Sequence, residues 1–194
     1  MLFRSLAMKL SALKRNCDRR TNLRAQLAAL ETITRQLDVD LELIVSRLRP
    51  PELDDLGLAA ALAHYVRRWS DTTGVRAEWH ATGETPGHLT DEMEIALYRI
   101  AQEALNNVAK HAHASHVAVL LNVRSDRASL IIEDDGAGFD SEHPTGAHQH
   151  FGINGMRERA TLAGGTLDLE SVPGKGTTVV ARIPFPASPQ GGEI

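Results

Sequence analysis

The sequence predicts an α+β protein in which a two-helix hairpin precedes a sandwich of helices packed against a mixed, mostly antiparallel sheet. Three observations predict this fold class: a heptad pattern of apolar residues that runs to Leu48, the proline pair Pro50–Pro51 after it, and alternating helical and strand patterns in the rest of the chain. The 194 residues suffice for one domain with its own core and a smaller appended element.

The N-terminal hairpin is expected over residues 1–49, with one helix up to about residue 18 and a second that ends near Leu48. Apolar residues of the second helix recur at alternating spacings of four and three, which is typical of a bundle or coiled coil. Neither helix can cover its own apolar face, so we expect the hairpin to dimerise. The repeating positions are Leu23, Leu27, Leu30, the polar exception Thr34, Leu37, Leu41, Ile44 and Leu48.

A second domain is expected over residues 50–186, followed by a disordered tail at 187–194. Proline disfavours helical geometry in the residue before it, so residues 50–56 are interpreted as the boundary segment. Periodicity and turn residues then predict three helices and five strands, with a flexible stretch at 136–152. The helices are expected at about 55–72, 90–112 (capped by Thr90) and 153–163, and the strands near 75–81, 115–124, 127–134, 165–172 and 177–183.

The composition excludes several classes of protein. The formal net charge of −4 gives no basis for nucleic-acid binding, which normally needs a basic face. No stretch is long and apolar enough to cross a membrane. A single cysteine, Cys17, rules out an internal disulfide framework and fits a reducing compartment.

Three polar residues line one edge of the predicted helix 90–112. Glu103, Asn107 and His111 are spaced four residues apart, so they advance only about 40° per step around the helix. Asn107 offers a neutral oxygen to Mg²⁺, and Glu103 can orient or deprotonate a metal-bound water or a hydroxyl. The alternative is an ordinary polar stripe on a half-buried helix.

A strand runs directly into an Asp-Gly sequence at Asp134. Its carboxylate can accept a hydrogen bond from the exocyclic amine of a nucleobase, and Gly136 and Gly138 allow the backbone to turn and a ligand to approach closely. A plain hairpin turn explains the same residues without a ligand.

Two further glycine pairs follow. Gly152 and Gly155 are expected to precede a helix, whose free amide groups could hold phosphate oxygens. The turn VPGKGT at 172–177 is typical of a simple hairpin, and Thr177 is its candidate pocket contact.

In this order and at these intervals, the motifs resemble the catalytic, ATP-binding domain of bacterial sensor histidine kinases from about Leu48 to Pro184. The N box lies in YRIAQEALNNVAKHA and the glycine boxes are DDGAGF, GINGM and PGKGT. The segment LRPPELDDLGL resembles the junction to the dimerisation helices in the subfamily paired with LuxR-type response regulators, which includes the hexose-phosphate and nitrate sensor kinases. The resemblance implies a GHKL (Bergerat) sandwich, with ATP and Mg²⁺ between a sheet and three helices under a flexible lid.

The resemblance also implies a role for each matching residue. Asp134 would contact the adenine amino group, Asn107 would ligate Mg²⁺, and Glu103 would assist the chemistry through a metal-bound water. Lys110 would touch phosphate, and Gly136, Gly138, Gly152 and Gly155 would shape the pocket and the lid. His111, as a member of the N box, and Thr177, as a pocket contact, would also bind ATP.

The implied reaction transfers the γ-phosphoryl group of ATP to a histidine and then to an aspartate of a LuxR/NarL-type response regulator. The implied partners are a second copy of the chain, bound through the N-terminal helices, and that regulator; nucleic acid and direct membrane contact are not expected. The implied location is cytoplasmic, and a full-length protein of this kind can be anchored in the inner membrane.

Three positions depart from the family pattern. The acceptor histidine of this subfamily lies in a His-Asp-x-Leu motif whose leucine aligns with Leu2, so we expect the acceptor to fall before Met1. Arg4 replaces a glutamine that helps relatives to dephosphorylate the regulator, and His150 replaces a frequent glycine. Two alternatives therefore stay open: a non-catalytic, dimerising ATP-binding module, and a GHKL ATPase or anti-sigma serine kinase.

Overall fold

The computed structural model describes residues 49–83, 89–140 and 147–185, with the side chains of residues 147–151 left out. All of them belong to the second of the two compact units into which the chain divides, Arg49–Ile194. The predicted hairpin up to Leu48 and the predicted tail at 187–194 lie outside the described residues. None of the helices in the described ranges is both long enough and apolar enough to span a membrane.

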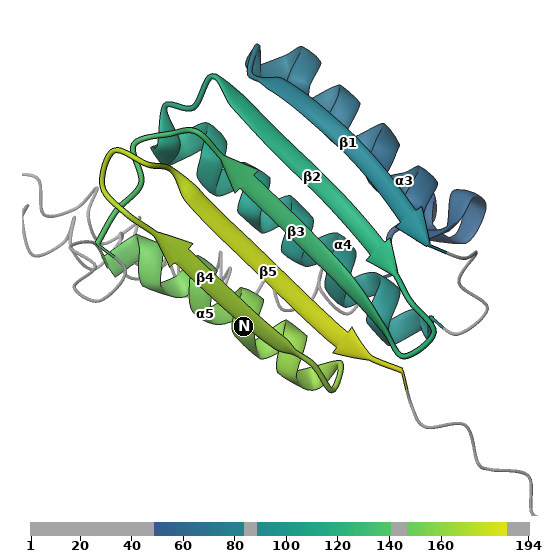
Figure 1. Ribbon diagram of the computed structural model, residues 1–194. Coiled ribbons are helices and arrows are strands. Elements are labelled where there is room, and N and C mark those ends of the chain that lie inside the picture. Colours follow the sequence, from purple (N-terminus) through teal and green to yellow (C-terminus); the bar gives the residue numbers. More distant parts are fainter. Residues whose placement is uncertain (1–48, 84–88, 141–146, 186–194) are drawn as a thin grey trace, which may run out of the picture. The chain divides into compact units, whose positions relative to one another are not determined.

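A five-stranded sheet forms one layer of the domain, and helices α3, α4 and α5 cover one of its faces (Figure 1). The strand order is β1-β2-β3-β5-β4; β1 pairs with β2 in parallel, and the other pairs are antiparallel. This confirms the predicted mixed, mostly antiparallel sheet. The strands are β1 (Arg76–Gly83), β2 (His116–Val123), β3 (Arg127–Asp134), β4 (Thr166–Ser171) and β5 (Thr177–Pro184).

Helix α3 (Pro51–Thr73) begins earlier than predicted, and the expected boundary segment 50–56 is mostly helical. Proline is tolerated at the first helical position, where its missing N–H has no intrahelical partner to lose. Gly57, with φ 72° and ψ 168°, then interrupts the helix. Leu53 and Leu58, on either side of this break, are both only 2% exposed, so the segment is part of the core.

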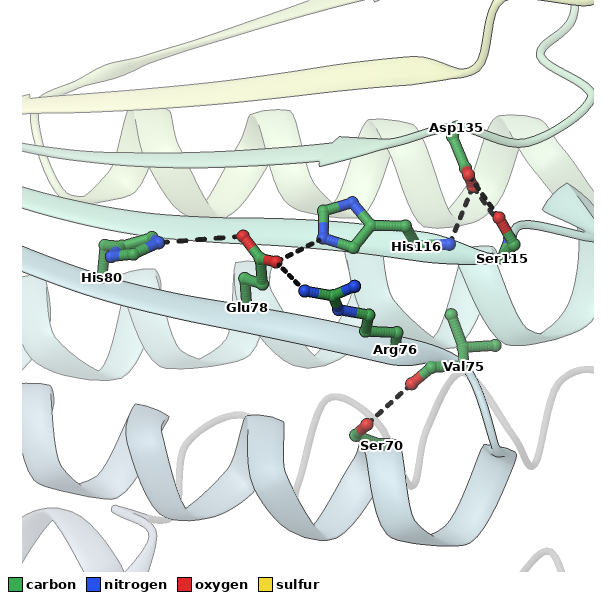
Figure 2. Close-up of polar contacts among 8 residues, drawn as sticks. All are labelled: Ser70, Val75, Arg76, Glu78, His80, Ser115, His116 and Asp135. Atoms are coloured by element: carbon green, nitrogen blue, oxygen red, sulfur yellow. Dashed lines mark hydrogen bonds and ion pairs between the residues drawn. The ribbon is translucent and has the colours of Figure 1, made fainter.

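The end of α3 leads directly into β1. Gly74 takes a left-handed conformation (φ 76°) that ends the helix, as glycine permits without a Cβ clash. The hydroxyl of Ser70 donates a hydrogen bond of 2.7 Å to the carbonyl of Val75, which fixes the start of the strand (Figure 2).

Helix α4 (Asp91–Asn107) is the central helix of the core. As predicted, Thr90 caps it by accepting a hydrogen bond from the amide of Met93. Its apolar stripe packs on the inward side chains of β2 and β3, which alternate between buried and partly exposed positions. The buried residues of α4 are Met93, Ala96, Leu97, Tyr98, Ile100, Ala101, Ala104 and Leu105.

The predicted helix to residue 112 ends in a different geometry. Residues Val108–Ala112 form a π-helix, η1, and His113 follows with a left-handed φ of 51°. Short π-helical turns of this kind are often found at functional sites.

Helix α5 (Ala147–Leu162) starts before the predicted 153–163. The end of the stretch that we expected to be flexible, up to residue 152, is therefore helical. Gly152 and Gly155 lie inside the helix rather than before it, so the prediction of free amide groups for phosphate at these two residues is wrong. Close packing explains the glycine at 152, as described below.

Candidate nucleotide-binding site

A pocket opens between the helical layer and the inner face of the sheet. Its walls come from α4 and η1 on one side, α5 on another, and β3, β4 and β5 beneath. Most of the lining is aliphatic, with a few polar groups, which is the usual composition of a small-molecule site. The lining residues are Ala104, Asn107, Val108, His111, Ala112, Ile132, Asp134, Gly138, Phe139, Ile153, Met156, Leu169, Thr177 and Val179.

Asp134 is the buried charged group of this pocket. It ends β3 and is only 6% exposed. Burial raises the pKa of its carboxyl group, while hydrogen bonds from the backbone amides of Gly136 and Thr177 act in the opposite direction. The amide of Gly136 donates to Oδ1 over 2.9 Å. A buried acceptor held in this way can pair selectively with a donor on a ligand.

The glycine loop after Asp134 is held by the protein's own backbone. The amide of Ala137 donates to the carbonyl of Ala112 over 2.7 Å, at the end of η1. A Cβ on Gly136 would lie 2.4 Å from that same oxygen, so only glycine fits there. Gly138, at φ 57°, similarly lies against the carbonyl of Val172, which a Cβ would approach to 2.1 Å. At both glycines the close approach is made by the polypeptide itself, and the predicted close approach of a ligand stays a prediction.

Ser171 is a buried polar residue of the site that the sequence did not predict. Its hydroxyl accepts from the amide of Phe139 over 2.9 Å and donates to the carbonyl of Gly176 over 3.1 Å. It also lies 2.9 Å from the hydroxyl of Thr177. Ser171 thus ties together the pocket wall at Phe139, the β4–β5 turn and the pocket residue Thr177.

Glu103 and Asn107 face the first part of α5. A Cβ built on Gly152 would lie 2.2 Å from Oε1 of Glu103 and 3.5 Å from Nδ2 of Asn107. Glycine at 152 therefore allows α5 to pack directly on the polar edge of α4. Asn107 lines the pocket, whereas Glu103 lies one turn further along the same edge.

Asp135, the neighbour of Asp134, has a different role. Its carboxylate accepts from the amides of Ser115 and His116 at 2.8 and 2.9 Å and from the hydroxyl of Ser115 at 2.5 Å (Figure 2). The hydrogen bond from the Ser115 side chain, followed by that from the His116 amide, lowers the pKa of Asp135. Asp135 thus anchors the start of β2 outside the pocket.

Comparison with known proteins identifies the domain that carries this pocket. Residues 92–187 match the family described as histidine kinase-, DNA gyrase B- and HSP90-like ATPase. This part of the chain belongs to that family. It is an ATP-binding domain, and every residue that lines the pocket lies within it.

The curated relatives of the ATPase domain are sensor kinases. The chain is 38% identical over 143 residues to the signal transduction histidine-protein kinase/phosphatase DegS of Brevibacillus brevis, covering 73% of this chain and 36% of the relative. It is 39% identical over 145 residues to the histidine-protein kinase/phosphatase UhpB of Salmonella typhimurium, covering 73% and 27%. It is 34% identical over 157 residues to the oxygen sensor histidine kinase NreB of Staphylococcus carnosus, covering 80% and 44%. The chain thus spans less than half the length of each of these relatives.

A solved structure shows the same fold. The histidine kinase domain of the blue-light activated histidine kinase EL346 from Erythrobacter litoralis superposes with a TM-score of 0.53 at 22% identity. The match covers 66% of this chain and 61% of the solved chain.

The structure brings most of the predicted site residues of the ATPase domain to one place. Asn107, His111, Asp134, Gly138 and Thr177 all line the pocket, and Gly136 lies between Asp134 and η1.

Besides Gly136, four predicted site residues lie outside the lining. Glu103 and Gly152 contact one another just beyond the pocket, Lys110 is exposed on η1, and Gly155 faces the guanidinium group of Arg159. The apolar lining residues Ile132, Leu169 and Val179 follow from strand alternation, whereas no local signal in the sequence marks Ser171.

Proposed function

We propose that this chain is the catalytic, ATP-binding part of a two-component sensor histidine kinase. It would transfer the γ-phosphoryl group of ATP to a histidine, from which an aspartate of a response regulator receives it. The observation that carries the proposal is the buried carboxylate of Asp134 in an apolar pocket whose helical wall presents Asn107 and His111. The ATPase family of the domain and the sensor kinases among its relatives support it.

Asp134 is proposed to bind the adenine ring by accepting a hydrogen bond from its amino group. The aliphatic side chains of Ile132, Met156 and Val179 around it offer an apolar surface to the ring. Because the carboxylate is buried, a base without an amino donor would leave it unpaired, which disfavours such bases. Gly136, Gly138 and Thr177 are proposed to shape this end of the site.

Asn107 and Glu103 are proposed to serve a Mg²⁺ ion and the phosphates. Their amide and carboxylate oxygens suit Mg²⁺, which prefers oxygen ligands and retains water when it binds nucleotide phosphates. The two side chains lie side by side against Gly152, so both can face one ligand. Bound Mg²⁺ would neutralise phosphate charge; Asn107 would ligate it directly and Glu103 through a water. Lys110 and His111 are proposed to contact phosphate oxygens, and Gly152 and Gly155 to shape the lid.

The partners of this kinase are also proposals. The heptad pattern up to Leu48 supports a homodimer through the N-terminal helices, and the LRPPELDDLGL junction supports a regulator of the LuxR/NarL type. A cytoplasmic location stays a prediction from the resemblance.

A nucleotide titration tests the binding site. Asp134→Asn should weaken ATP binding by about 1–3 kcal/mol, because the buried acceptor becomes a poorer partner for the adenine amine. Glu133→Gln is the matched control: it removes a carboxylate from the adjacent residue of β3, which is exposed and faces away from the pocket. Isothermal calorimetry measures both. Equal affinities for wild type and Asp134→Asn would overturn the assignment.

The magnesium assignment has its own test. Asn107→Ala should remove most of the dependence of ATP affinity on Mg²⁺, while ATP binding in the presence of a chelator stays close to that of wild type. A full Mg²⁺ dependence in the variant would contradict the role of Asn107.

The transfer step requires a phosphoacceptor. It is tested on the protein translated from the genomic reading frame, including any residues encoded before Met1. Acid-labile, ATP-dependent phosphate on a histidine is the expected product. Intact ATP binding without such a product would instead favour the non-catalytic, dimerising ATP-binding module.

A further inference from the structure

Three polar residues form one row across the inner face of the sheet. Asp134 of β3 lies opposite Thr177 of β5, and Thr177 lies opposite Ser171 of β4. Residues directly opposite one another in antiparallel strands point to the same face, with Cβ atoms about 5 Å apart. Asp134 and Thr177 line the pocket, whereas Ser171, on the far side of Thr177 from Asp134, is buried. The row thus presents two oxygen-bearing side chains to a ligand and supports them with a third.

The hydroxyl group of Ser171 has a single proton, and the carbonyl of Gly176 accepts it. A carbonyl oxygen cannot donate, so the 3.1 Å contact between Ser171 Oγ and this carbonyl requires Ser171 to be the donor. The amide of Phe139 donates to the same hydroxyl over 2.9 Å and occupies one of its two acceptor positions. Ser171 is therefore left with one acceptor position and no proton.

This remaining acceptor position fixes the direction of the hydrogen bond between Ser171 and Thr177. Their hydroxyl oxygens lie 2.9 Å apart, and because Ser171 has no second proton, Thr177 is the donor. The opposite direction would leave the oxygens of Ser171 and Gly176 facing one another at 3.1 Å without a proton between them, which is unfavourable in a buried place. The proton of Thr177 thus points toward β4, and a lone pair of its oxygen stays free for a ligand.

The carboxylate of Asp134 adds further acceptors beside Thr177. It receives hydrogen bonds from the backbone amides of Gly136, over 2.9 Å, and Thr177. An ionised carboxylate has about four acceptor positions and no proton, so some positions remain after these two bonds. The two side chains together offer a ligand only acceptors. An amino group, which has two protons, suits such a pair, whereas an oxo group would meet two acceptors without a donor.

We propose that Ser171 is a positioning residue for base selection: by holding the proton of Thr177, it makes Thr177 an acceptor next to Asp134. The pocket then favours a base with an amino group over a base with an oxo group at the same place. This inference rests on the proposed function, because it assumes that the base binds at Asp134. Without the hydroxyl of Ser171, Thr177 is free to turn its proton toward an oxo group.

The experiment measures the affinities of the full chain for ATP and for ITP, each with Mg²⁺, by displacement of a fluorescent ATP analogue. ITP carries an oxo group where ATP carries the amino group. In Ser171→Ala, the ratio of ATP affinity to ITP affinity should fall about three- to tenfold, which corresponds to one hydrogen bond. A merely structural role of Ser171 would weaken both nucleotides equally. An unchanged ratio therefore overturns the proposal.

Two further serine variants complete this measurement. Ser129→Ala is the matched control, because Ser129 is a serine of β3 that lies between the buried Ala128 and Leu130 and points to the opposite face of the sheet. It should leave both affinities unchanged. If Ser171→Ala does not fold, Ser171→Cys takes its place, since a thiol is a weak donor and a weak acceptor. The ratio should then fall by less than in the alanine variant, and an unchanged ratio again contradicts the role of Ser171.

Thr177→Val tests the direction of the hydrogen bond. Valine has nearly the same shape as threonine but no hydroxyl group, so the variant loses the acceptor and should weaken ATP binding more than ITP binding. A lower ratio is expected. A higher ratio would mean that Thr177 donates into the pocket, and either a higher or an unchanged ratio overturns the proposal. Thr178→Val, at the next residue of β5, changes the other face of the sheet and should leave the ratio as in wild type.

Asp134→Asn separates this inference from the proposed function. If Asp134→Asn leaves ATP affinity unchanged, the proposed adenine site fails. If Asp134→Asn weakens ATP binding while Ser171→Ala leaves the ratio of ATP affinity to ITP affinity unchanged, only the inference about Ser171 fails.

Discussion

The two ends of helix α4 are built in opposite ways. At its N-terminus Thr90 caps the helix, and the guanidinium group of Arg49 contacts the carboxylates of Asp91 at 2.9 Å and Glu94 at 2.7 Å. At its C-terminus the helix widens into the π-helix η1, which ends at a left-handed His113. At the N-terminal end, a backbone amide and the acidic side chains each have a partner, whereas at the C-terminal end the α-helical geometry is lost.

This difference indicates that the N-terminal end of α4 contributes to stability, whereas its C-terminal end also supports the nucleotide pocket. The carbonyl of Ala112, at the irregular end, holds the glycine loop through the amide of Ala137. The regular end, at Asp91, lies about 32 Å from Ala112 along the helix, if each residue adds the rise of an α-helix. Changes at the regular end should therefore reduce stability alone, whereas changes at the irregular end should reduce both stability and nucleotide binding.

The largest expected effect is at Gly176, in the turn that packs against Asp134. Gly176 has a φ of 79°, and a Cβ there would lie 1.9 Å from the carbonyl oxygen of Asp134. Gly176→Ala should lower the free energy of unfolding by about 3 kcal/mol or more and also weaken ATP binding, because the backbone of Asp134 must move. Urea denaturation and calorimetry measure the two effects.

Gly174→Ala is the control for this change. Gly174 has almost the same φ, 78°, but nothing lies within 4 Å of a Cβ built on it. This substitution should cost only about 1 kcal/mol, from the left-handed backbone alone. Equal losses at the two glycines would show that the contact with Asp134 does not matter.

The next expected effect concerns Asp134→Asn, which should weaken ATP binding and yet raise the stability of the nucleotide-free protein. Because burial raises the pKa of Asp134, the ionised carboxylate is less favourable in the folded than in the unfolded protein. Its contribution to stability is complete below the unfolded pKa and is lost as the pH rises through the folded pKa. At neutral pH, Asp134→Asn without nucleotide should therefore melt at a higher temperature than wild type, with the difference shrinking toward acid pH. Thermal melts from acid to neutral pH measure the difference. A lower melting temperature for the variant than for wild type at neutral pH would contradict the prediction.

At the regular end, Arg49→Gln should lower the free energy of unfolding by about 1 kcal/mol, because the ion pairs are only partly shielded from water. The side chain of Arg49 is 23% exposed and that of Glu94 is 15% exposed. ATP affinity should stay unchanged. A double-mutant cycle with Glu94→Gln measures the coupling, which should be favourable; additive losses would mean that the pair contributes nothing.

The smallest expected effect is at Thr90. Thr90→Ala removes the cap and should cost about 0.5 kcal/mol, at the low end for such changes, since the hydrogen bond to Met93 is long at 3.4 Å. Thr90→Ser should restore stability in the same urea denaturation experiment. Loss of ATP binding in the alanine variant would contradict the separation of the two ends.

The sequence alone determined the features that depend on neighbouring residues in one helix or strand. The alternation of Val117, Val119 and Leu121 predicted which face of β2 is buried, and Thr90 marked the start of α4. The spacing of Glu103, Asn107 and His111 predicted a shared helical edge, and the family resemblance assigned the order of the motifs. Each of these signals lies within one element, where backbone geometry fixes which side chains share a face.

Only the tertiary structure decided which elements meet. It placed Gly152 against Glu103 and joined Ser171 to Phe139 and Thr177. It also divided the pair Asp134–Asp135 into one buried and one exposed carboxylate with opposite changes in pKa. The reason is that such contacts join residues far apart in the chain, and their closeness depends on how helices and sheet pack, which no local pattern encodes.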